Sequence, residues 1–308
     1  MSTPLRIGII GLGARCSIVE NCQVSSVPAE LVGGCDPNSA MRERAREILG
    51  DHPWVESLEE LLDLGIDAAI VTSPDDTHED ITCQLLEAGV GVYLEKPIAI
   101  TIEGADRVLE TAYRTRTPLY VGHNMRHMAV VRILRQVIRD GLIGEVRAIW
   151  CRHFVGNGGD YYFKDWHADR SRTTGLLLQK AAHDIDVMNW LSDSVPERVV
   201  GMGDLMVYGK LTDRSGQRRD SVMSDWFSFD NWPPESLTGL NPVIDVEDLS
   251  MFMMRQVSGT MISYEQCHFT PDYWRNYTVI GTRGRAENFG DGDGGVVRVW
   301  KHRSRWEP

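Results

Sequence analysis

The chain has 308 residues, of which 42% are hydrophobic and 25% are charged, an ordinary composition for a globular protein. This length exceeds one typical hydrophobic core, so we expect two domains, at residues 1–122 and 123–308. The formal net charge of -12 excludes the basic surface that nonspecific nucleic-acid binding needs, so no nucleic-acid partner is expected.

Targeting and redox features point to one compartment. No apolar run approaches the ~20 residues of a membrane span, and the opening MSTPLRIGIIGLG lacks the layout of a signal peptide. The six cysteines show neither CxxC nor another zinc-ligand spacing. We therefore expect a cytoplasmic protein with no membrane partner.

The first part of the chain alternates short apolar runs with helical patterns. Strands are predicted at 6–10, 29–35, 67–74, 91–97 and 118–124, with helices at 11–24, 39–50, 78–89 and 102–115. Continuous apolar strands that alternate with helices indicate a parallel sheet covered on both faces. This pattern predicts a doubly wound, Rossmann-type α/β domain.

The pattern changes in the second part. Helices are predicted at 130–144 and 175–191, and extended runs at 145–155, 243–256, 258–267, 276–288 and 294–302. We expect an α+β domain with a large, mostly antiparallel sheet that is open on one face, and a long polar excursion at 209–242. Exposed apolar side chains on that sheet, such as Met251, Met253 and Ile262, would favour a homodimer or homotetramer.

A glycine-rich turn, GLGARC at 11–16, follows the first predicted strand and opens a helix. Gly11 and Gly13 would allow the backbone, including Ala14 and Arg15, to approach a pyrophosphate at the helix N-terminus. Cys16 stands where the GxGxxG fingerprint has its third glycine, so the motif is partial. The turn nevertheless predicts dinucleotide binding because it lies between a strand and a helix.

Asp36 ends the second predicted strand and can accept hydrogen bonds from a ribose diol. Its carboxylate would repel a 2′-phosphate, so NAD is the expected cofactor. NADP stays possible because Arg15 could meet that phosphate. The alternative for Asp36 is a helix N-cap before Pro37.

Further cofactor contacts are expected where the other strands end, since ligands of open α/β sheets lie beyond the carboxyl ends of the strands. The candidates are Thr72, Ser73, Pro74, His78, Glu95, Lys96 and Asn124. The segment EKP, residues 95–97, is the most informative. A lysine that directly follows a buried strand and precedes a proline would point its ammonium at the cofactor, whereas the alternative is a surface ion pair.

These motifs resemble a known family. The partial glycine fingerprint, TSPDDTH at 72–78, LEKP at 94–97 and HDIDVMNWL at 183–191 occur in the order and spacing of the Gfo/Idh/MocA oxidoreductases. The resemblance covers nearly the whole chain. It implies an NAD(P)-dependent enzyme for sugars or cyclitols, with Lys96 as the lysine of its EKP motif and His183 as its active-site histidine.

The sequence departs from that family at two places. Many members carry an aspartate four residues before the histidine, where this chain has Gln179, which cannot take up a proton. The segment LLLQKAAHDID is more similar to a branch with LLEK or LLQK before the histidine. Members also usually continue with a helical segment after the last strand, and this sequence runs only to Pro308.

The helix at 175–191 supplies the predicted catalytic base. Oxidation of an alcohol requires removal of its hydroxyl proton, and histidine, with an unperturbed pKa near 6.5, suits that task. His183 is therefore the candidate base, while Lys96 would donate to the substrate oxygen and Gln179 would contact a substrate hydroxyl. Asp186 would either hold the His183 tautomer or cap local backbone, and Lys180 would pair with Asp184.

The segment before that helix, residues 156–175, is rich in aromatic and polar residues. Trp166 and Arg170 could stack on a sugar ring or bind its hydroxyls, while the alternative is an aromatic loop folded on itself. His153, His167 and His183 lack a ligand spacing, so no metal is expected.

Three functions remain open. The first is NAD(P)-dependent hydride transfer at a secondary alcohol of a sugar, cyclitol or related polyol. The second is an NAD-dependent lyase, glycosidase or epimerase that oxidises a sugar transiently and forms no net NADH. The third is a non-catalytic dinucleotide-binding sensor.

Overall fold

The computed structural model describes residues 3–24, 27–216 and 221–303. These residues form two compact units. Of the described residues, the first unit takes in 3–24, 27–122, 171–174 and 221–226, and the second takes in 123–170, 175–216 and 227–303. Within the described ranges, every helix is too short or too polar to cross a lipid bilayer.

The described part of the first unit contains a six-stranded parallel sheet in the order β3-β2-β1-β4-β5-β6. Its strands are β1 (Leu5–Ile10), β2 (Ala29–Cys35), β3 (Trp54–Val55), β4 (Ala68–Val71), β5 (Gly91–Leu94) and β6 (Leu119–Val121). The order reverses between β1 and β4. In open α/β sheets such a reversal marks the place where ligands bind.

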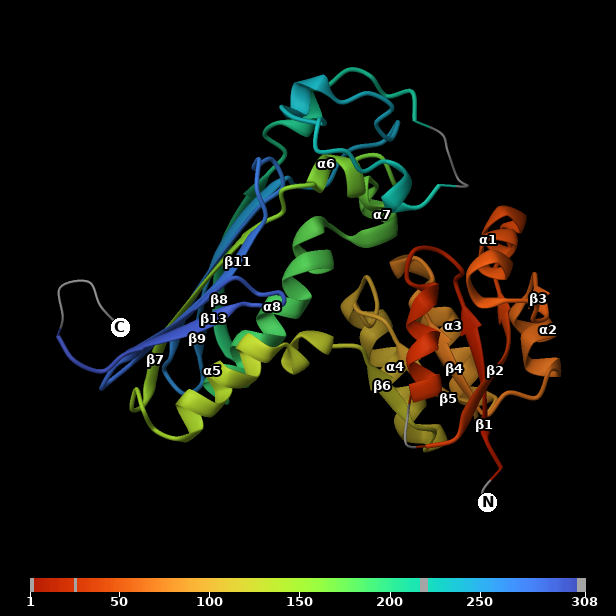
Figure 1. The fold of residues 1–308 in the computed structure, drawn as a ribbon, viewed down its shortest axis with the longest axis horizontal. Helices are drawn as coiled ribbons and strands as arrows, with labels where there is room; N and C mark the ends of the chain where they lie inside the picture. The colour runs from red at the N-terminus through yellow and green to blue at the C-terminus, as the bar shows by residue number, and fades with distance from the viewer. Residues whose placement is uncertain (1–2, 25–26, 217–220, 304–308) are drawn as a thin grey trace. The chain divides into compact units, whose positions relative to one another are not determined.

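Helices cover both faces of this sheet (Figure 1). They are η1 (Cys16–Val24), α1 (Ser39–Leu49), α2 (Leu58–Asp63), η2 (Asp75–Thr77), α3 (His78–Glu87) and α4 (Ile102–Thr115). Ile9 packs with Cys16 on one face, whereas its neighbour Ile10 packs with Leu85 on the other. Alternate side chains of one strand thus enter two cores, which confirms the predicted doubly wound sheet.

Local details differ from the prediction. The helix after the glycine turn is a 3-10 helix, and neither β3 nor α2 was predicted. Cys16, at the third fingerprint position, is buried in the apolar core with Leu12 and Val19. The cysteine therefore fills space that a glycine would leave empty.

The second unit contains, in its described residues, a seven-stranded sheet in the order β13-β12-β11-β7-β10-β9-β8. All neighbouring pairs are antiparallel except β7 and β10. The strands are β7 (Val146–Phe154), β8 (Pro196–Asp204), β9 (Leu249–Gln256), β10 (Met261–Cys267), β11 (Trp274–Gly281), β12 (Arg285–Phe289) and β13 (Val296–Trp300). This architecture confirms the predicted α+β domain.

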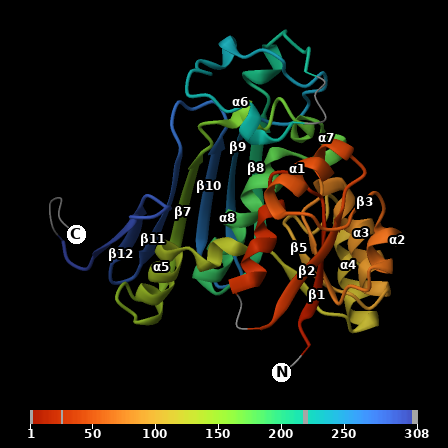
Figure 2. The ribbon, with the colours of Figure 1, turned by 45° about the vertical axis from the view of Figure 1, so that its right-hand side comes forward.

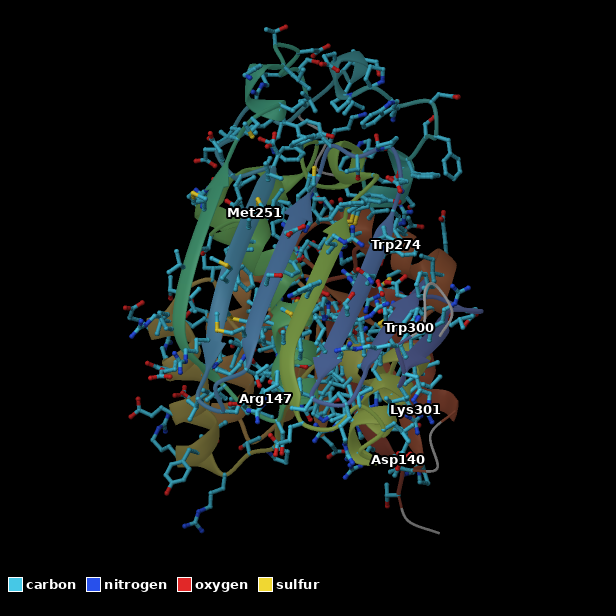
Figure 3. All side chains as sticks on the ribbon, turned by 90° about the vertical axis from the view of Figure 1, so that its left-hand side faces the viewer. Asp140, Arg147, Met251, Trp274, Trp300 and Lys301 are labelled. Carbon is cyan, nitrogen blue, oxygen red and sulfur yellow. The ribbon has the colours of Figure 1, made fainter. Side chains whose placement is uncertain are left out.

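One face of this sheet is covered by α5 (Ala129–Arg139) and α8 (Leu176–Ser192) (Figure 2). Leu134 of α5 and Val187 of α8 belong to the same core as Ile149 and Tyr277 of the sheet. The opposite face is open, and the side chains of Met251 and other residues lie on it without a covering layer (Figure 3).

Two predictions about this sheet were wrong, and one strand was missed. Ile262 is only 2% exposed, because side chains alternate along β10 and the exposed neighbour is Met261. The run 276–288 is broken by a turn between β11 and β12, which pair as a hairpin. The edge strand β8 was not predicted, and nearly all its residues are exposed. Between β8 and β9 the described residues form only loops and the short helices η5 (Tyr208–Lys210), η6 (Met223–Asp225) and η7 (Pro234–Ser236).

Candidate functional site

The glycine turn of the first unit touches the loop that follows β4. Gly11 has a φ of +86°, and a Cβ atom on it would lie 2.4 Å from the backbone nitrogen of Ser73. Thr72 Oγ1 donates a hydrogen bond of 2.7 Å to the Gly11 carbonyl. By contrast, a Cβ atom on Gly13 would meet nothing within 4 Å. The structure thus brings Gly11, Thr72 and Ser73 together and leaves Gly13 with open space beside its backbone.

Asp36 holds this turn from the end of β2. Its Oδ2 accepts from the backbone N–H of Leu12 at 2.9 Å, and its Oδ1 accepts from that of Asn38 at 2.9 Å. The alternative prediction, that Asp36 caps α1, was wrong because Asn38 is the N-cap and accepts from Ala40. A carboxylate has about four acceptor positions, so Asp36 retains capacity for a ribose diol.

The EKP segment is tied to the same turn. Arg15 Nη2 lies 3.0 Å from Glu95 Oε1, and the Glu95 carboxylate is nearly buried while the Arg15 side chain is 56% exposed. Lys96 follows directly and precedes a cis peptide bond to Pro97. The Arg15 guanidinium, which could have met a 2′-phosphate, thus already engages an internal carboxylate through Nη2.

His78 supports two of these loops from inside the unit. Its Nδ1 lies 2.7 Å from the Pro97 carbonyl and its Nε2 lies 3.0 Å from the Ser73 carbonyl. The ring is 1% exposed. Because both nitrogens face backbone carbonyls, the contacts of His78 are to the protein scaffold.

A segment that precedes α8 in the sequence also belongs to this unit. Arg172 forms an ion pair of 3.2 Å with Asp76, and Thr173 Oγ1 donates to Asp75 Oδ2 at 3.3 Å. Both aspartates lie in η2, directly after the loop at 72–74. Ser171–Thr174 thus packs beside the predicted cofactor residues.

The residues of the first unit fit a dinucleotide. The backbone beside Gly13 is accessible, the strand order reverses between β1 and β4, and Asp36 has spare acceptor capacity. Asn124, the remaining cofactor candidate, begins η3 (Asn124–His127) in the second unit. Across the residues that the structure describes, no group of three or more His, Cys, Asp or Glu side chains has a metal-binding arrangement.

The predicted helix with His183 is α8, and its start is held by a glutamate from a distant loop. Glu247 Oε1 accepts from the Leu177 N–H at 2.6 Å, and a Cβ atom on Gly175 would lie 2.7 Å from that oxygen. Arg170 Nη2 lies 2.9 Å from Glu247 Oε2. Arg170, predicted to bind substrate, therefore holds the carboxylate that caps α8.

Other charged residues of α8 have partners that the helical spacing did not predict. Asp186 forms an ion pair with Arg126, whose Nε donates to Asp186 Oδ2 at 2.7 Å. Lys180 Nζ lies 4.4 Å from the centre of the Tyr162 ring. Asp184 is fully buried and faces the sheet.

The segment before α8 forms α6 (Gly158–Tyr161), η4 (Trp166–Ala168) and α7 (Arg170–Thr173). Trp166 stacks on His167 with a centroid distance of 3.6 Å, and the edge of Tyr162 meets His167 at 5.2 Å. The aromatic rings therefore pack on one another, as the alternative prediction held. Gln179 is 6% exposed, so little of its side chain reaches the surface.

Asp184 and Glu247 are structural carboxylates that the sequence reasoning missed. Asp184 had one available signal, because Ala181, Val187 and Met188 surround it at helical spacing and all lie in the core. Glu247 gave no signal, because it lies 70 residues from the Leu177 amide that it binds.

Known proteins match this chain along most of its length. The model of the oxidoreductase family with an NAD-binding Rossmann fold matches residues 5–123, and the GFO/IDH/MocA C-terminal domain matches residues 131–287. The protein YteT of Bacillus subtilis (strain 168) is 27% identical over 256 residues, which cover 72% of this chain and 60% of YteT. The glucose-6-phosphate 3-dehydrogenase of the same organism is 31% identical, and the match covers 63% of this chain and 56% of that enzyme.

The fold also occurs in solved structures. The WlbA dehydrogenase from Bordetella pertussis, in complex with NADH and UDP-GlcNAcA, matches with a TM-score of 0.77 and 21% identity. The match covers 98% of this chain and 84% of WlbA. At this identity the likeness concerns the fold alone. From the two family models and the fold together, the chain belongs to the GFO/IDH/MocA oxidoreductase family.

Proposed function

We propose that the protein transfers a hydride between NAD and a secondary alcohol of a sugar, cyclitol or related polyol. Residues 1–122 would bind the cofactor and residues 123–308 the substrate. Related proteins include inositol 2-dehydrogenases, for example that of Azotobacter vinelandii, which is 29% identical over 197 residues. The substrate class of this chain is inferred from such relatives.

Two residues carry the chemistry in this proposal. His183 accepts the hydroxyl proton of the alcohol, and Lys96 donates a hydrogen bond to the same oxygen, where negative charge develops. The hydride leaves the carbon with its electron pair, and the alcohol becomes a ketone. NAD, when bound, supplies the nicotinamide that takes up this hydride. Gln179 contacts a substrate hydroxyl without exchanging a proton.

The observation that carries the proposal is the ion pair between Arg15 and Glu95. It joins the glycine turn to the residue next to Lys96. The ammonium is therefore attached to a segment that is fixed beside the nucleotide-binding turn. The same pair supports NAD over NADP, because it occupies Arg15 while Asp36 disfavours a 2′-phosphate.

A substrate screen tests this function. The purified protein, NAD and a panel of sugars and inositols should produce NADH, measured by absorbance at the nicotinamide band. Lys96→Ala and His183→Ala should each lower kcat by roughly 100- to 10,000-fold while NAD still binds. Exposed Lys210→Ala is the control and should retain activity. Full activity in a variant that lacks both side chains would rule out this mechanism.

Gln179 favours a second candidate, a lyase, glycosidase or epimerase that oxidises its sugar only transiently. A glutamine cannot relay the proton away, which suits a reaction that returns the hydride in the same cycle. This function predicts bond cleavage or epimerisation without net NADH. Product analysis by mass spectrometry beside the NADH assay distinguishes the two.

We also propose that two copies associate through the open face of the second-unit sheet. Val200 and Met253 are paired across β8 and β9 and are 63% and 59% exposed, and Met202 beside them is 82% exposed. Exposed apolar side chains on a sheet edge favour association. Figure 3 shows this face, with Met251 on β9, the strand next to the edge strand β8.

A further inference from the structure

The buried carboxylate of Asp184 lies on the side of α8 that faces the sheet. Its exposed fraction is 0%, and its neighbours on that side of the helix are apolar, namely Ala181, Val187, Met188 and Leu191. His183, the proposed base, is the preceding residue. An apolar side chain would fill the position of Asp184 without the cost of removing a charge from water. The carboxylate therefore needs an explanation other than packing.

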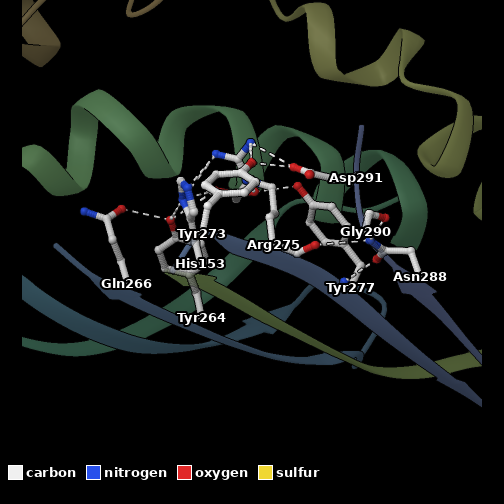
Figure 4. Close-up of polar contacts among 10 residues, drawn as sticks. His153, Tyr264, Gln266, Tyr273, Arg275, Tyr277, Asn288, Gly290 and Asp291 are labelled. Atoms are coloured by element: carbon white, nitrogen blue, oxygen red, sulfur yellow. Dashed lines mark hydrogen bonds and ion pairs between the residues drawn. The ribbon is translucent and has the colours of Figure 1, made fainter. Parts of the chain in front are cut away.

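Four polar side chains from three adjacent strands contact this carboxylate. Figure 4 labels all four, His153, Tyr264, Arg275 and Tyr277. Tyr277 Oη donates to Oδ1 at 2.5 Å, and Arg275 Nε lies 3.2 Å from the same oxygen. Tyr264 Oη donates to Oδ2 at 3.0 Å, and His153 Nδ1 lies 3.4 Å from it. Asp184 thus accepts two hydrogen bonds, from the tyrosine hydroxyls, and has two further contacts with nitrogen atoms of Arg275 and His153.

The protonation states within the cluster are mutually consistent. Burial and the nearby Arg275 guanidinium lower the pKa of His153 to about 4, so the ring is neutral at physiological pH. Arg275 Nη2 lies 3.0 Å from His153 Nε2 and 3.2 Å from His153 Nδ1, so one nitrogen of the neutral ring can accept from the guanidinium while the other carries the proton. Burial alone would raise the pKa of Asp184, but Arg275 and the hydrogen bonds from His153 and Tyr277 hold it well below its ordinary value.

The same cluster reaches the first turn of α8. Gln266 Nε2 donates to the Leu176 carbonyl at 3.1 Å. Gln266 Oε1 lies 2.8 Å from Tyr264 Oη and is the other acceptor within reach of the single hydroxyl proton that Tyr264 can donate to Asp184. The helix is thus attached to the sheet at two points, at Leu176 and at Asp184. Apolar contacts tolerate sliding and rotation of a helix, whereas directional hydrogen bonds at two points do not.

We propose that Asp184 is a positioning residue for His183: its two hydroxyl donors and its ion pair with Arg275 fix the rotation and depth of α8 on the sheet and so fix the adjacent imidazole. The inference rests on the proposed function of His183 as base. Buried ion pairs are commonly no more stabilising than apolar side chains of similar volume. The contribution of this cluster is therefore to the geometry of the helix.

Removal of single hydroxyl donors tests the proposal with the least damage to the fold. Tyr277→Phe and Tyr264→Phe each delete one donor and keep the ring. Tyr208→Phe is the matched control, because Tyr208 is also buried in the second unit but donates to the His268 carbonyl. We expect kcat to fall about tenfold in the first two variants, as a small displacement of a reacting group would cause, with KM changed less than about twofold. The control should keep both constants.

A measurement without turnover separates this inference from the proposed function. The imidazole nitrogen resonances of His183, assigned by comparison with His183→Gln, should shift in Tyr277→Phe and Tyr264→Phe and stay unchanged in Tyr208→Phe. If the wild-type protein oxidises no alcohol but these shifts occur, the hydride-transfer function fails and the positioning role stands. Unchanged resonances in all three variants would overturn the positioning role whatever the reaction is.

A double variant distinguishes positioning from stability. In Asp184→Leu/Arg275→Met an apolar pair replaces the buried ion pair. Tyr264 keeps Gln266 as an acceptor and only the Tyr277 hydroxyl loses its partner, so we expect the Tm to fall by no more than a few degrees. The proposal predicts that kcat nevertheless falls roughly 100-fold. A stable double variant with wild-type kcat would show that the cluster only holds the fold together.

Discussion

Gly11 and Gly13 stand two positions apart in one turn, yet the structure constrains them differently. The φ of Gly11 lies in the left-handed region, and its missing side chain makes room for the backbone of Ser73. Gly13 has an ordinary φ and open space beside it. The two glycines therefore serve two purposes, close packing of protein loops at Gly11 and accessible backbone at Gly13.

This difference gives a paired prediction. Gly11→Ala should destabilise the protein by roughly 1–3 kcal/mol from the backbone conformation alone, with a further cost from the clash with Ser73. Gly13→Ala should leave the Tm nearly unchanged and should weaken NAD binding, measured by isothermal titration calorimetry. An unchanged Tm in Gly11→Ala would contradict the described turn.

A second prediction at the residue scale concerns pH. The pKa of His153 is about 4 in the folded protein, against an ordinary value of 6.5, so the unfolded chain binds this proton more readily. The contribution of the neutral His153 ring to the free energy of unfolding is therefore complete above pH 6.5. It is lost as the pH falls toward 4, and the total loss is on the order of 3 kcal/mol.

Chemical denaturation at several pH values measures this loss. His153→Gln should be less stable near neutral pH but should show a flatter dependence between pH 6.5 and 4. His268, whose pKa is also lowered by burial, remains in both proteins, so the difference between the two curves reports His153. Parallel curves would contradict the assignment.

At the scale of elements, α8 shows which features helical periodicity predicts and which it does not. The pattern predicted the helix and its position, and the structure places Met188 and Leu191 in the core. It did not predict that Asp184 faces the core, because a charged residue is read as exposed unless its partners are known. Those partners lie on β7, β10 and β11, between 31 and 93 residues away along the chain.

The cap of α8 gives a prediction for this element. Glu247→Ala removes the acceptor for Leu177 and the partner of Arg170, so we expect a loss of about 1–2 kcal/mol in the free energy of unfolding. Glu197→Ala on the exposed edge strand β8 is the control and should change stability by less than about 0.5 kcal/mol. Equal losses in the two variants would argue against the cap.

At the scale of the whole molecule, the open face of the second-unit sheet is the surface through which we expect two copies to associate. Met253→Glu would place a carboxylate between Val200 and Ser263, its cross-strand neighbours. If two copies meet through this face, the variant should raise the dissociation constant roughly 100-fold, measured by analytical ultracentrifugation. Tyr113→Glu on α4, where the side chain is 88% exposed, should leave association unchanged. A wild-type protein that is monomeric at all concentrations would refute the interface.

The sequence by itself determined the fold class, the glycine turn, the EKP segment and the helix that carries His183. These follow from local patterns, since strand and helix periodicity and turn chemistry are properties of neighbouring residues. Tertiary structure alone decided the pairing of Arg15 with Glu95, the burial of Asp184, the cap from Glu247 and the side of β10 that Ile262 faces. Each of these depends on which distant strands become neighbours, and a one-residue change of register reverses every side chain of a strand.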